Sequence, residues 1–285
     1  MKPADFDYHA PRTLDEALAL LAAHRDDGKL LAGGQSLVPV MNFRLARPAH
    51  LIDLNGIGEL DYLREENGVL RVGALTRHAA FHRPVAAGAT GRLLAEVVQH
   101  IAHYPIRNRG TFCGSLAHAD PSSEWCLVMT ALDGEMVARS AKGTRTIPAR
   151  EFFQGIMTTA LRDDELLVEA QLPLLPAGTR CGFYEFSRRA GDFAMAAALG
   201  VYRLDGGKIA EQRVAVGGVE PNPRRIAQAE QALAGAEPGD KAFRAAADAA
   251  MHAVDAMEDA ITSAEFRRDL VLAVTRRALE RAAAE

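Results

Sequence analysis

Two short glycine-rich segments constrain this 285-residue chain more than any other part of its sequence. The first reads Ala32-Gly33-Gly34-Gln35-Ser36-Leu37 and the second reads Arg109-Gly110-Thr111-Phe112-Cys113-Gly114-Ser115. Each lies beside an apolar run that could form a strand. Each also offers consecutive backbone N–H groups with no Cβ atoms to block a ligand. Neither segment has Rossmann or Walker spacing. Together they predict two loops around one anionic ligand, of which a diphosphate makes the best use of such N–H groups.

A structural explanation competes with this interpretation, because a single Gly-Gly pair is more often a tight turn without a ligand. The second segment favours a ligand. Arg107 and Arg109 bring positive charge, and Asp120 and Glu124 follow at a distance suited to hydroxyl groups. A ligand with phosphates and a sugar or polyol accounts for both halves, whereas a structural turn accounts only for the glycines.

Charge and composition exclude several classes of partner. The net charge of −4 provides no basic excess for a nucleic acid. No apolar run approaches the roughly 20 residues of a membrane helix, and the N-terminus lacks the apolar region of a signal peptide. Cys113, Cys126 and Cys181 are an odd number without C-x-x-C spacing, which argues against disulfides and against a zinc or iron–sulfur cage. We therefore expect a cytoplasmic protein with no metal site in this chain.

The pattern of apolar residues predicts an α+β protein in two parts. A capping box at Thr13–Glu16 begins a helix that we expect to stop near Gly28, and Asp120 with Pro121 predicts the start of a helix that reaches Leu132. Around 93–103 the period is helical until Pro105 interrupts it, and 173–178 is the best linker. Strands are expected at 29–32, 50–54, 69–74, 136–138, 144–147, 165–172, 182–188, 194–204 and 208–216, with Asp205-Gly206 as a hairpin turn. Helices follow from Ile226, and Thr262–Glu265 predicts a capping box for the last one.

Three stretches of this sequence resemble one family closely. They are Leu31–Leu37 with the following 44–48 and 50–54, then Ile106–Pro121, then Ser187–Ala194. Together they resemble the FAD-binding medium subunit of molybdenum hydroxylases, the relatives of xanthine dehydrogenase and carbon monoxide dehydrogenase. The resemblance covers essentially the whole chain, and its two glycine motifs are specific.

The resemblance implies a fold and a division into domains. Residues 1–176 would form an FAD-binding domain of the vanillyl-alcohol-oxidase (PCMH) type, with subdomains at about 1–56 and 57–176. Residues 177–285 would form a small α/β C-terminal domain like that of the carbon monoxide dehydrogenase flavoprotein, an antiparallel sheet with helices.

The resemblance also implies which residues contact FAD. The two glycine segments would wrap the diphosphate, Glu124 would reach the adenosine ribose, and Ile101 would pack on the isoalloxazine ring. Residues 187–192 would approach that ring from the second domain. The expected FAD-binding residues are Ala32, Gly33, Gly34, Gln35, Ser36, Leu37, Ile101, Gly110, Thr111, Cys113, Gly114, Ser115, Ala117, Asp120, Glu124, Leu167, Asp192 and Phe193.

Cys113 is the one clear departure from the family pattern, which usually reads Thr-x-Gly-Gly in the second segment. If this position required a positive φ, a Cβ there would cost about 1 kcal/mol. FAD is still expected to bind, because the backbone donors survive. A redox-active thiol is the functional alternative. We favour a small tolerated side chain, since no second cysteine lies close in sequence. For His118 and Asp120 we favour a satisfied histidine and a helix cap over a metal site.

No nucleophile is accompanied by a base and an orienting acid, which fits a protein whose flavin carries the chemistry. The resemblance implies an electron-transfer subunit. Electrons would pass from two [2Fe–2S] clusters of a small subunit through FAD to NAD, oxygen, a quinone or another carrier. A large molybdopterin subunit would set the substrate, and the complex would be a dimer of heterotrimers. A free-standing FAD oxidoreductase of the same fold and a flavin-free assembly module are the alternatives. Gln35, where carbon monoxide dehydrogenases often have His, weighs weakly against carbon monoxide as the substrate.

Overall fold

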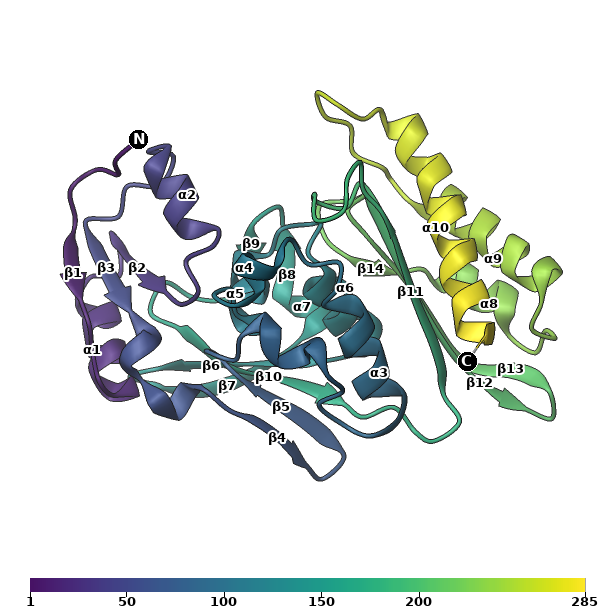
Figure 1. Ribbon diagram of the computed structural model, residues 1–285, viewed down its shortest axis with the longest axis horizontal. Coiled ribbons are helices and arrows are strands. Elements are labelled where there is room, and N and C mark those ends of the chain that lie inside the picture. Colours follow the sequence, from purple (N-terminus) through teal and green to yellow (C-terminus); the bar gives the residue numbers. More distant parts are fainter. Residues whose placement is uncertain (285) are drawn as a thin grey trace.

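The computed structural model describes residues 1–284, and a parallel sheet opens the chain (Figure 1). Its strands are β1 (Asp7–His9), β3 (His50–Asp53) and β2 (Gly28–Leu31), in that order across the sheet. Helix α1 (Leu14–Ala23) packs on β2 and β3, and α2 (Leu37–Asn42) follows the first glycine segment. Strand β2 therefore delivers the chain directly into that segment.

The middle of the molecule is a five-stranded antiparallel sheet with helices on one side (Figure 1). Its order is β4 (Leu63–Glu66), β5 (Val69–Gly73), β10 (Leu166–Pro173), β6 (Glu135–Ser140) and β7 (Gly143–Pro148). The helices are α3 (Gly88–Val97), α4 (Tyr104–Arg107), α5 (Phe112–His118), α6 (Glu124–Ala131) and α7 (Ala149–Phe152), and β8 (Phe153–Gly155) pairs with β9 (Thr158–Thr159). Three short 3-10 helices span Leu54–Gly56, Gly58–Leu60 and His78–His82.

The C-terminal part is a four-stranded antiparallel sheet covered by helices. Strands β11 (Arg180–Phe186), β12 (Ala196–Asp205), β13 (Lys208–Gly217) and β14 (Arg224–Arg225) lie in chain order. Helices α8 (Ala227–Leu233), α9 (Asp240–Ala253) and α10 (Ala264–Ala284) follow. A hairpin turn joins β12 to β13 as predicted, but its two turn residues are Gly206 and Gly207, with positive φ angles of 55° and 83°, rather than Asp205 and Gly206.

Two apolar cores hold these parts. The larger fills the first two sheets and their helices and includes the fully buried Trp125, Phe81 and Phe112, whose rings pack together. The smaller lies under α9 and α10 and includes Tyr202 and Phe243. Among the described residues, no helix has both the length and the apolar character needed to cross a membrane.

Several predicted boundaries are wrong for local reasons. The capping box of α1 is confirmed. The helix was expected to stop near Gly28 but ends at Ala23, and Gly28 is the first residue of β2. Helix α6 begins at Glu124 after Ser123 rather than after Asp120. The Asp120 carboxylate instead accepts from Ser122 N at 2.9 Å, so it caps a turn and not a helix.

Other elements also differ from the predicted ones. Ser263, one residue later than predicted, accepts from Phe266 N at the start of α10. The helical pattern at 93–103 belongs to α3, which begins at Gly88 and ends at Val97. Pro105 lies inside the short α4, in its first turn, where proline is tolerated. Helices α2 and α5 were missed, because both begin within the glycine segments, α2 at Leu37 and α5 at Phe112.

Gly182 fixes how closely α10 approaches β11. A Cβ on Gly182 would lie 2.2 Å from the carbonyl oxygen of Ala278 and 2.5 Å from the nitrogen of Ala282. We expect Gly182→Ala to lower the free energy of unfolding by about 1–3 kcal/mol, because helix and strand must separate. Thermal unfolding measures this change. Gly58→Ala is the control, since nothing lies within 4 Å of that position. Equal melting temperatures for the two variants would contradict the close approach.

Candidate functional site

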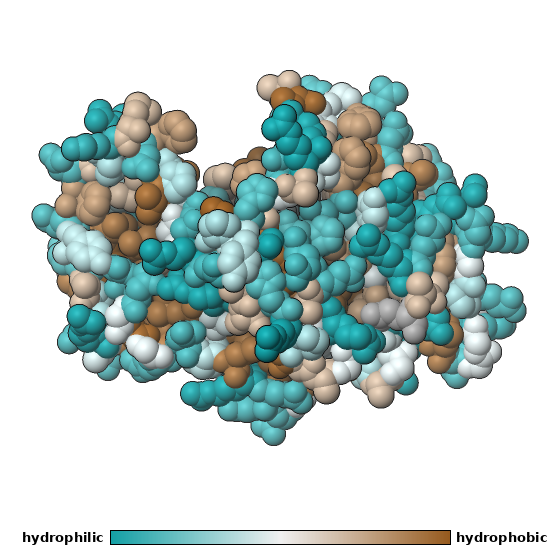
Figure 2. Space-filling model, in the orientation of Figure 1, coloured by the Kyte–Doolittle hydropathy of each residue, from teal (hydrophilic) through white to brown (hydrophobic). Residues whose placement is uncertain are grey.

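The two glycine segments meet at one cavity of about 370 Å³. It opens between the N-terminal lobe that carries α2 and the middle of the molecule, where Figure 2 shows a notch in the surface. Residues from both segments, from α5 and from β10 line it. Of the residues predicted to bind FAD, the lining includes Ala32, Gly33, Gly34, Gln35, Ser36, Leu37, Gly110, Thr111, Cys113, Gly114, Ser115, Ala117 and Leu167.

The first segment is shaped by its two glycines in different ways. Gly33 lies against the second segment, where a Cβ would be 2.4 Å from the carbonyl oxygen of Arg109 and 2.6 Å from the Cα of Gly110. Gly34 has a φ of 71°, a left-handed conformation that side chains disfavour. Within residues 1–284, the backbone N–H groups of 33–36 have no hydrogen-bond acceptor. The segment therefore presents unpaired donors to the cavity.

The second segment is the start of a helix rather than an open loop. Thr111 precedes α5, and its hydroxyl oxygen accepts from Gly114 N at 3.1 Å. A Cβ on Gly114 would lie 2.5 Å from that oxygen, so glycine is needed for this cap. The positive end of the helix dipole faces the same cavity and favours an anion there.

A chain of hydrogen bonds joins the two segments behind their contact. Asn55 Nδ2 donates to the carbonyl oxygen of Ala32 at 2.8 Å. Arg77 donates both to the Asn55 amide oxygen and to the carbonyl oxygen of Arg109. Arg77 also forms a β-bridge with Thr111. One guanidinium thus fixes the spacing of the two backbones.

His78 is a cavity residue that the sequence analysis missed. It is buried, and its backbone N–H donates to Gly110 O at 3.0 Å. Trp125 Nε1 donates to His78 Nδ1 at 3.0 Å, so the proton of the neutral ring lies on Nε2. Burial, reinforced by the charge of Arg77, lowers the pKa of His78 to about 4. The His78 ring beneath Gly110 is therefore neutral. No sequence motif identifies His78 as a cavity residue.

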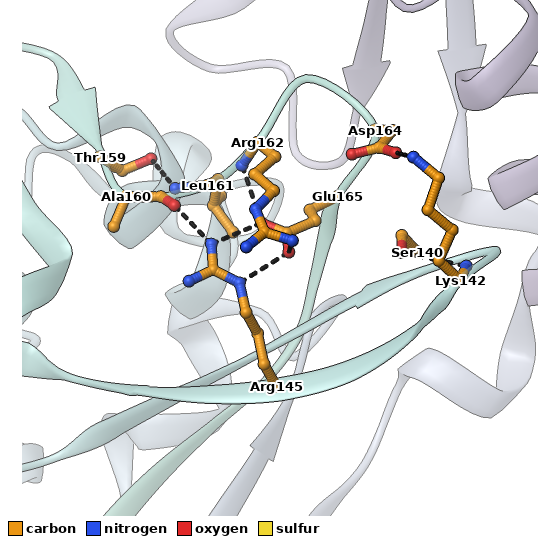
Figure 3. Close-up of polar contacts among 9 residues, drawn as sticks. All are labelled: Ser140, Lys142, Arg145, Thr159, Ala160, Leu161, Arg162, Asp164 and Glu165. Carbon is orange, nitrogen blue, oxygen red and sulfur yellow. Dashed lines mark hydrogen bonds and ion pairs between the residues drawn. The ribbon is translucent and has the colours of Figure 1, made fainter.

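The cavity wall also includes the buried Glu165, which forms an ion pair with the partly exposed Arg145 (Figure 3). The guanidinium of Arg145 makes two 2.7 Å hydrogen bonds with the carboxylate of Glu165, whose side chain is 4% exposed. Arg145 also donates to the carbonyl oxygen of Ala160 at 2.6 Å. These hydrogen bonds with Arg145 lower the pKa of Glu165.

A β-bulge after Leu167 interrupts the pairing of β10 with β6 at this wall.

The structure corrects the expected strain at Cys113. This residue lies in the first turn of α5 and is not among the positive-φ residues, so its Cβ costs nothing in the backbone. Its side chain is buried, with Sγ 3.5 Å from the carbonyl oxygen of Val72. Burial raises the pKa of the Cys113 thiol far above its usual range. Such a thiol is inert, which supports the structural interpretation of this residue.

Five of the predicted residues do not line the cavity and lie where the middle and C-terminal parts meet. They are Ile101, Asp120, Glu124, Asp192 and Phe193. Ser122 donates to the carbonyl oxygen of Ala194 at 2.9 Å, and Gly218 N donates to Pro121 O at 2.8 Å. Phe193 is 73% exposed. Helix α5 leads from the cavity to this interface.

The same interface holds a cluster of carboxylates. Glu185 is 4% exposed and lies 3.4 Å from His100 Nδ1, measured from Oε1. Its other oxygen, Oε2, is buried without a hydrogen-bond partner among the described residues. Burial is the main cause that raises the pKa of Glu124 to about 8, and the negative charge of Glu185 is the second cause. Glu124 and Glu185 are therefore neighbouring carboxylates, and Glu185 keeps one buried acceptor atom unsatisfied among the described residues.

Comparison with known families matches both parts of the chain. Residues 4–175 match the family described as "FAD binding domain in molybdopterin dehydrogenase". Residues 182–282 match the family described as "CO dehydrogenase flavoprotein C-terminal domain".

Individual relatives match over nearly their full length. The caffeine dehydrogenase subunit beta of Pseudomonas sp. (strain CBB1) is 41% identical, with 99% of this chain and 96% of the relative covered. Subunit alpha of the 6-hydroxypseudooxynicotine dehydrogenase complex of Paenarthrobacter nicotinovorans is 39% identical, with the same coverage of 99% and 96%. A chain in the solved structure of carbon monoxide dehydrogenase from Hydrogenophaga pseudoflava superimposes with a TM-score of 0.95 at 38% identity, with 100% and 99% of the two chains covered.

Gly33→Ala tests whether the contact between the two segments shapes the binding site. A methyl group at this position must push apart Gly33 and the carbonyl of Arg109, because the atoms would lie 2.4 Å apart. We expect the affinity for FAD to fall at least about tenfold, as measured by fluorescence titration of the flavin-depleted chain. Gly58→Ala is the control, since nothing lies within 4 Å of Gly58. Unchanged affinity in Gly33→Ala would rule out the contact as a determinant of binding.

Glu124→Gln tests the raised pKa of Glu124 in the flavin-free chain. The folded state holds the Glu124 proton up to a pH of about 8, whereas the unfolded chain releases it near the ordinary glutamate pKa of 4.5. Below pH 4.5 the contribution of Glu124 to the free energy of unfolding is therefore fully present. It is lost as the pH rises to about 8. We expect Glu124→Gln to flatten this decline in urea unfolding measured across the interval. Glu237→Gln, which removes an exposed carboxylate, is the control. An unchanged slope in Glu124→Gln would show that Glu124 is not protonated in the fold.

Proposed function

Because this chain belongs to the family of FAD-binding subunits of molybdenum hydroxylases, we propose that the two glycine segments hold the diphosphate of one FAD in their shared cavity. The observation that carries the proposal is the contact of Gly33 with the backbone at Arg109 and Gly110. It brings the unpaired N–H groups of 33–36 and the N-terminus of α5 to one place. A diphosphate accepts from both sets of donors at once.

The rest of FAD fits along the path of α5. From the cavity this helix leads to Asp120 and Glu124, and ribose or ribityl hydroxyl groups would donate further hydrogen bonds to these carboxylates. The buried, unpartnered Oε2 of Glu185 fits the same chemistry. We propose that the polyol part of FAD lies along this interface, which accounts for the predicted residues outside the cavity.

Residues from the C-terminal part complete the proposed site. Gly191 has a φ of 86°, and a Cβ there would lie 2.4 Å from the His103 ring. The segment 187–193 is thereby held close to Ala102 and His103, next to Ile101 in sequence. We propose that Ile101, Asp192 and Phe193 border the isoalloxazine ring, and that a domain boundary near 176 lets both domains contribute to one site.

Bound FAD would supply two-electron and one-electron redox chemistry, and the residues of this chain would position it and exclude water. We propose that the chain passes electrons from the two [2Fe–2S] clusters of a small subunit to an external acceptor. A large molybdopterin subunit would oxidise the substrate. The relatives are named as subunits of larger enzymes, which supports this division. The expected cytoplasmic location and dimer of heterotrimers belong to the same proposal.

Purification of the untagged chain from its native host tests this function. We expect one FAD per chain together with molybdenum and iron in the same particle. In the Gly33→Ala chain, molybdenum and iron should remain while flavin is lost, and reduction of NAD or a quinone by the dithionite-reduced complex should fall at least about tenfold. Gly58→Ala should behave as the wild type, since nothing lies near that position.

Two other results would identify the alternatives. An active flavoprotein that purifies alone, without molybdenum or iron, would point to a free-standing FAD oxidoreductase. A complete complex without any flavin would point to an assembly module. Either result would contradict the proposed role.

A further inference from the structure

Three histidines from separate elements of the N-terminal sheet come together away from the cavity. His9 ends β1, His24 follows α1 directly, and His50 begins β3. One nitrogen from each ring lies within 4.8 Å of the other two. His9 Nε2 and His50 Nδ1 are 3.1 Å apart. None of the three lines the cavity between the glycine segments.

The register of the parallel sheet imposes this arrangement. Asp7 and Gly28 both pair with His50, so all three positions face the same side of the sheet, as does His9 two residues after Asp7. Gly28 leaves the space beside His50 free. A Cβ on Gly28 would lie 3.1 Å from the Cβ of His24, so glycine makes the room that His24 occupies. Gly28 N also donates to the carbonyl oxygen of His24 at 2.6 Å, which fixes the turn.

We propose that His9, His24 and His50 bind one divalent transition-metal ion such as Zn²⁺. Imidazole nitrogen is a preferred ligand for zinc, cobalt, nickel and copper. In a tetrahedral site with zinc–nitrogen distances of about 2.0–2.1 Å, ligand nitrogens lie about 3.3 Å apart. The His9–His50 nitrogens at 3.1 Å already meet this spacing. His24 stacks on His50 with ring centroids 3.6 Å apart, and a rotation of its ring turns a nitrogen toward the same ion.

Asp7 supplies the fourth ligand in this proposal. Its Oδ2 lies 3.6 Å from His50 Nδ1, and its side chain is 79% exposed and so free to turn inward. The three histidines are half-buried, which gives the ion a path from solvent. A tetrahedral set of three imidazoles and one carboxylate or water is an ordinary zinc environment.

Metal binding at this site would brace the strand that enters the binding cavity. The ion would join β1, the end of α1 and β3. Strand β2 lies between α1 and β3 in the sequence. Strand β2 ends at Leu31, directly before the first glycine segment. The proposal departs from the sequence-based expectation that this chain has no metal site. The three histidines are too far apart in sequence to form a recognisable motif.

Metal uptake by the untagged full-length chain, isolated in its complex and treated with chelator, tests the proposal. Equilibrium dialysis with Zn²⁺ gives the stoichiometry and affinity, and Co²⁺ gives a visible spectrum that reports tetrahedral ligands. The variants are His9→Gln, His24→Gln and His50→Gln. His252→Gln is the matched control, because His252 is 68% exposed on α9 and lies far from the sheet in sequence.

We expect the wild-type chain and His252→Gln to bind one additional Zn²⁺ with the same affinity. Each of the other variants should bind it at least about tenfold more weakly and lose the tetrahedral Co²⁺ spectrum. The metal should also raise the melting temperature of the wild-type chain but not of His50→Gln. Unchanged binding in all three variants, or no uptake by the wild type, would overturn the proposal and leave the rings as a stack of side chains. FAD content is measured alongside, so failure of this site is separable from failure of the proposed cofactor site.

Discussion

The approach of two backbones at Gly33 and Gly110 determines what the rest of the structure can do. A side chain at Gly33 would overlap the carbonyl oxygen of Arg109, so only glycine lets the first sheet and α5 share one cavity. Neither segment would enclose a diphosphate alone. Their joint position converts two sets of unpaired N–H groups into one concave site with positive potential.

Around this contact the protein places rigid supports rather than reactive groups. Arg77 and Asn55 tie the segments together, and the neutral His78 under Gly110 is held by Trp125. Elsewhere on the cavity wall, Arg145 satisfies the buried Glu165. None of these groups is arranged as a nucleophile with its base. The pattern suits a protein that positions a redox cofactor and leaves the chemistry to it.

The sequence predicted the parts of this site that local patterns encode. The glycine segments, the α1 capping box and the antiparallel hairpin at Asp205 depend on residues close in the chain. His78 could not be found, because its role depends on Trp125 and Gly110, which come from distant parts of the sequence. The expected strain at Cys113 has a local cause instead. The Thr111 cap makes Cys113 part of the first turn of a helix, whereas two glycines flanking a short segment favour an open loop.

The burial of two cysteine side chains affects how easily this protein would be oxidised. Oxidants attack the thiolate form of cysteine, so a cysteine beside a bound redox cofactor would be at risk if its pKa were low. Cys113 lines the cavity, and burial raises the pKa of both Cys113 and Cys126. Both sulfurs therefore stay protonated and shielded from solvent. The cavity can therefore be lined by a cysteine whose sulfur is protected from oxidation.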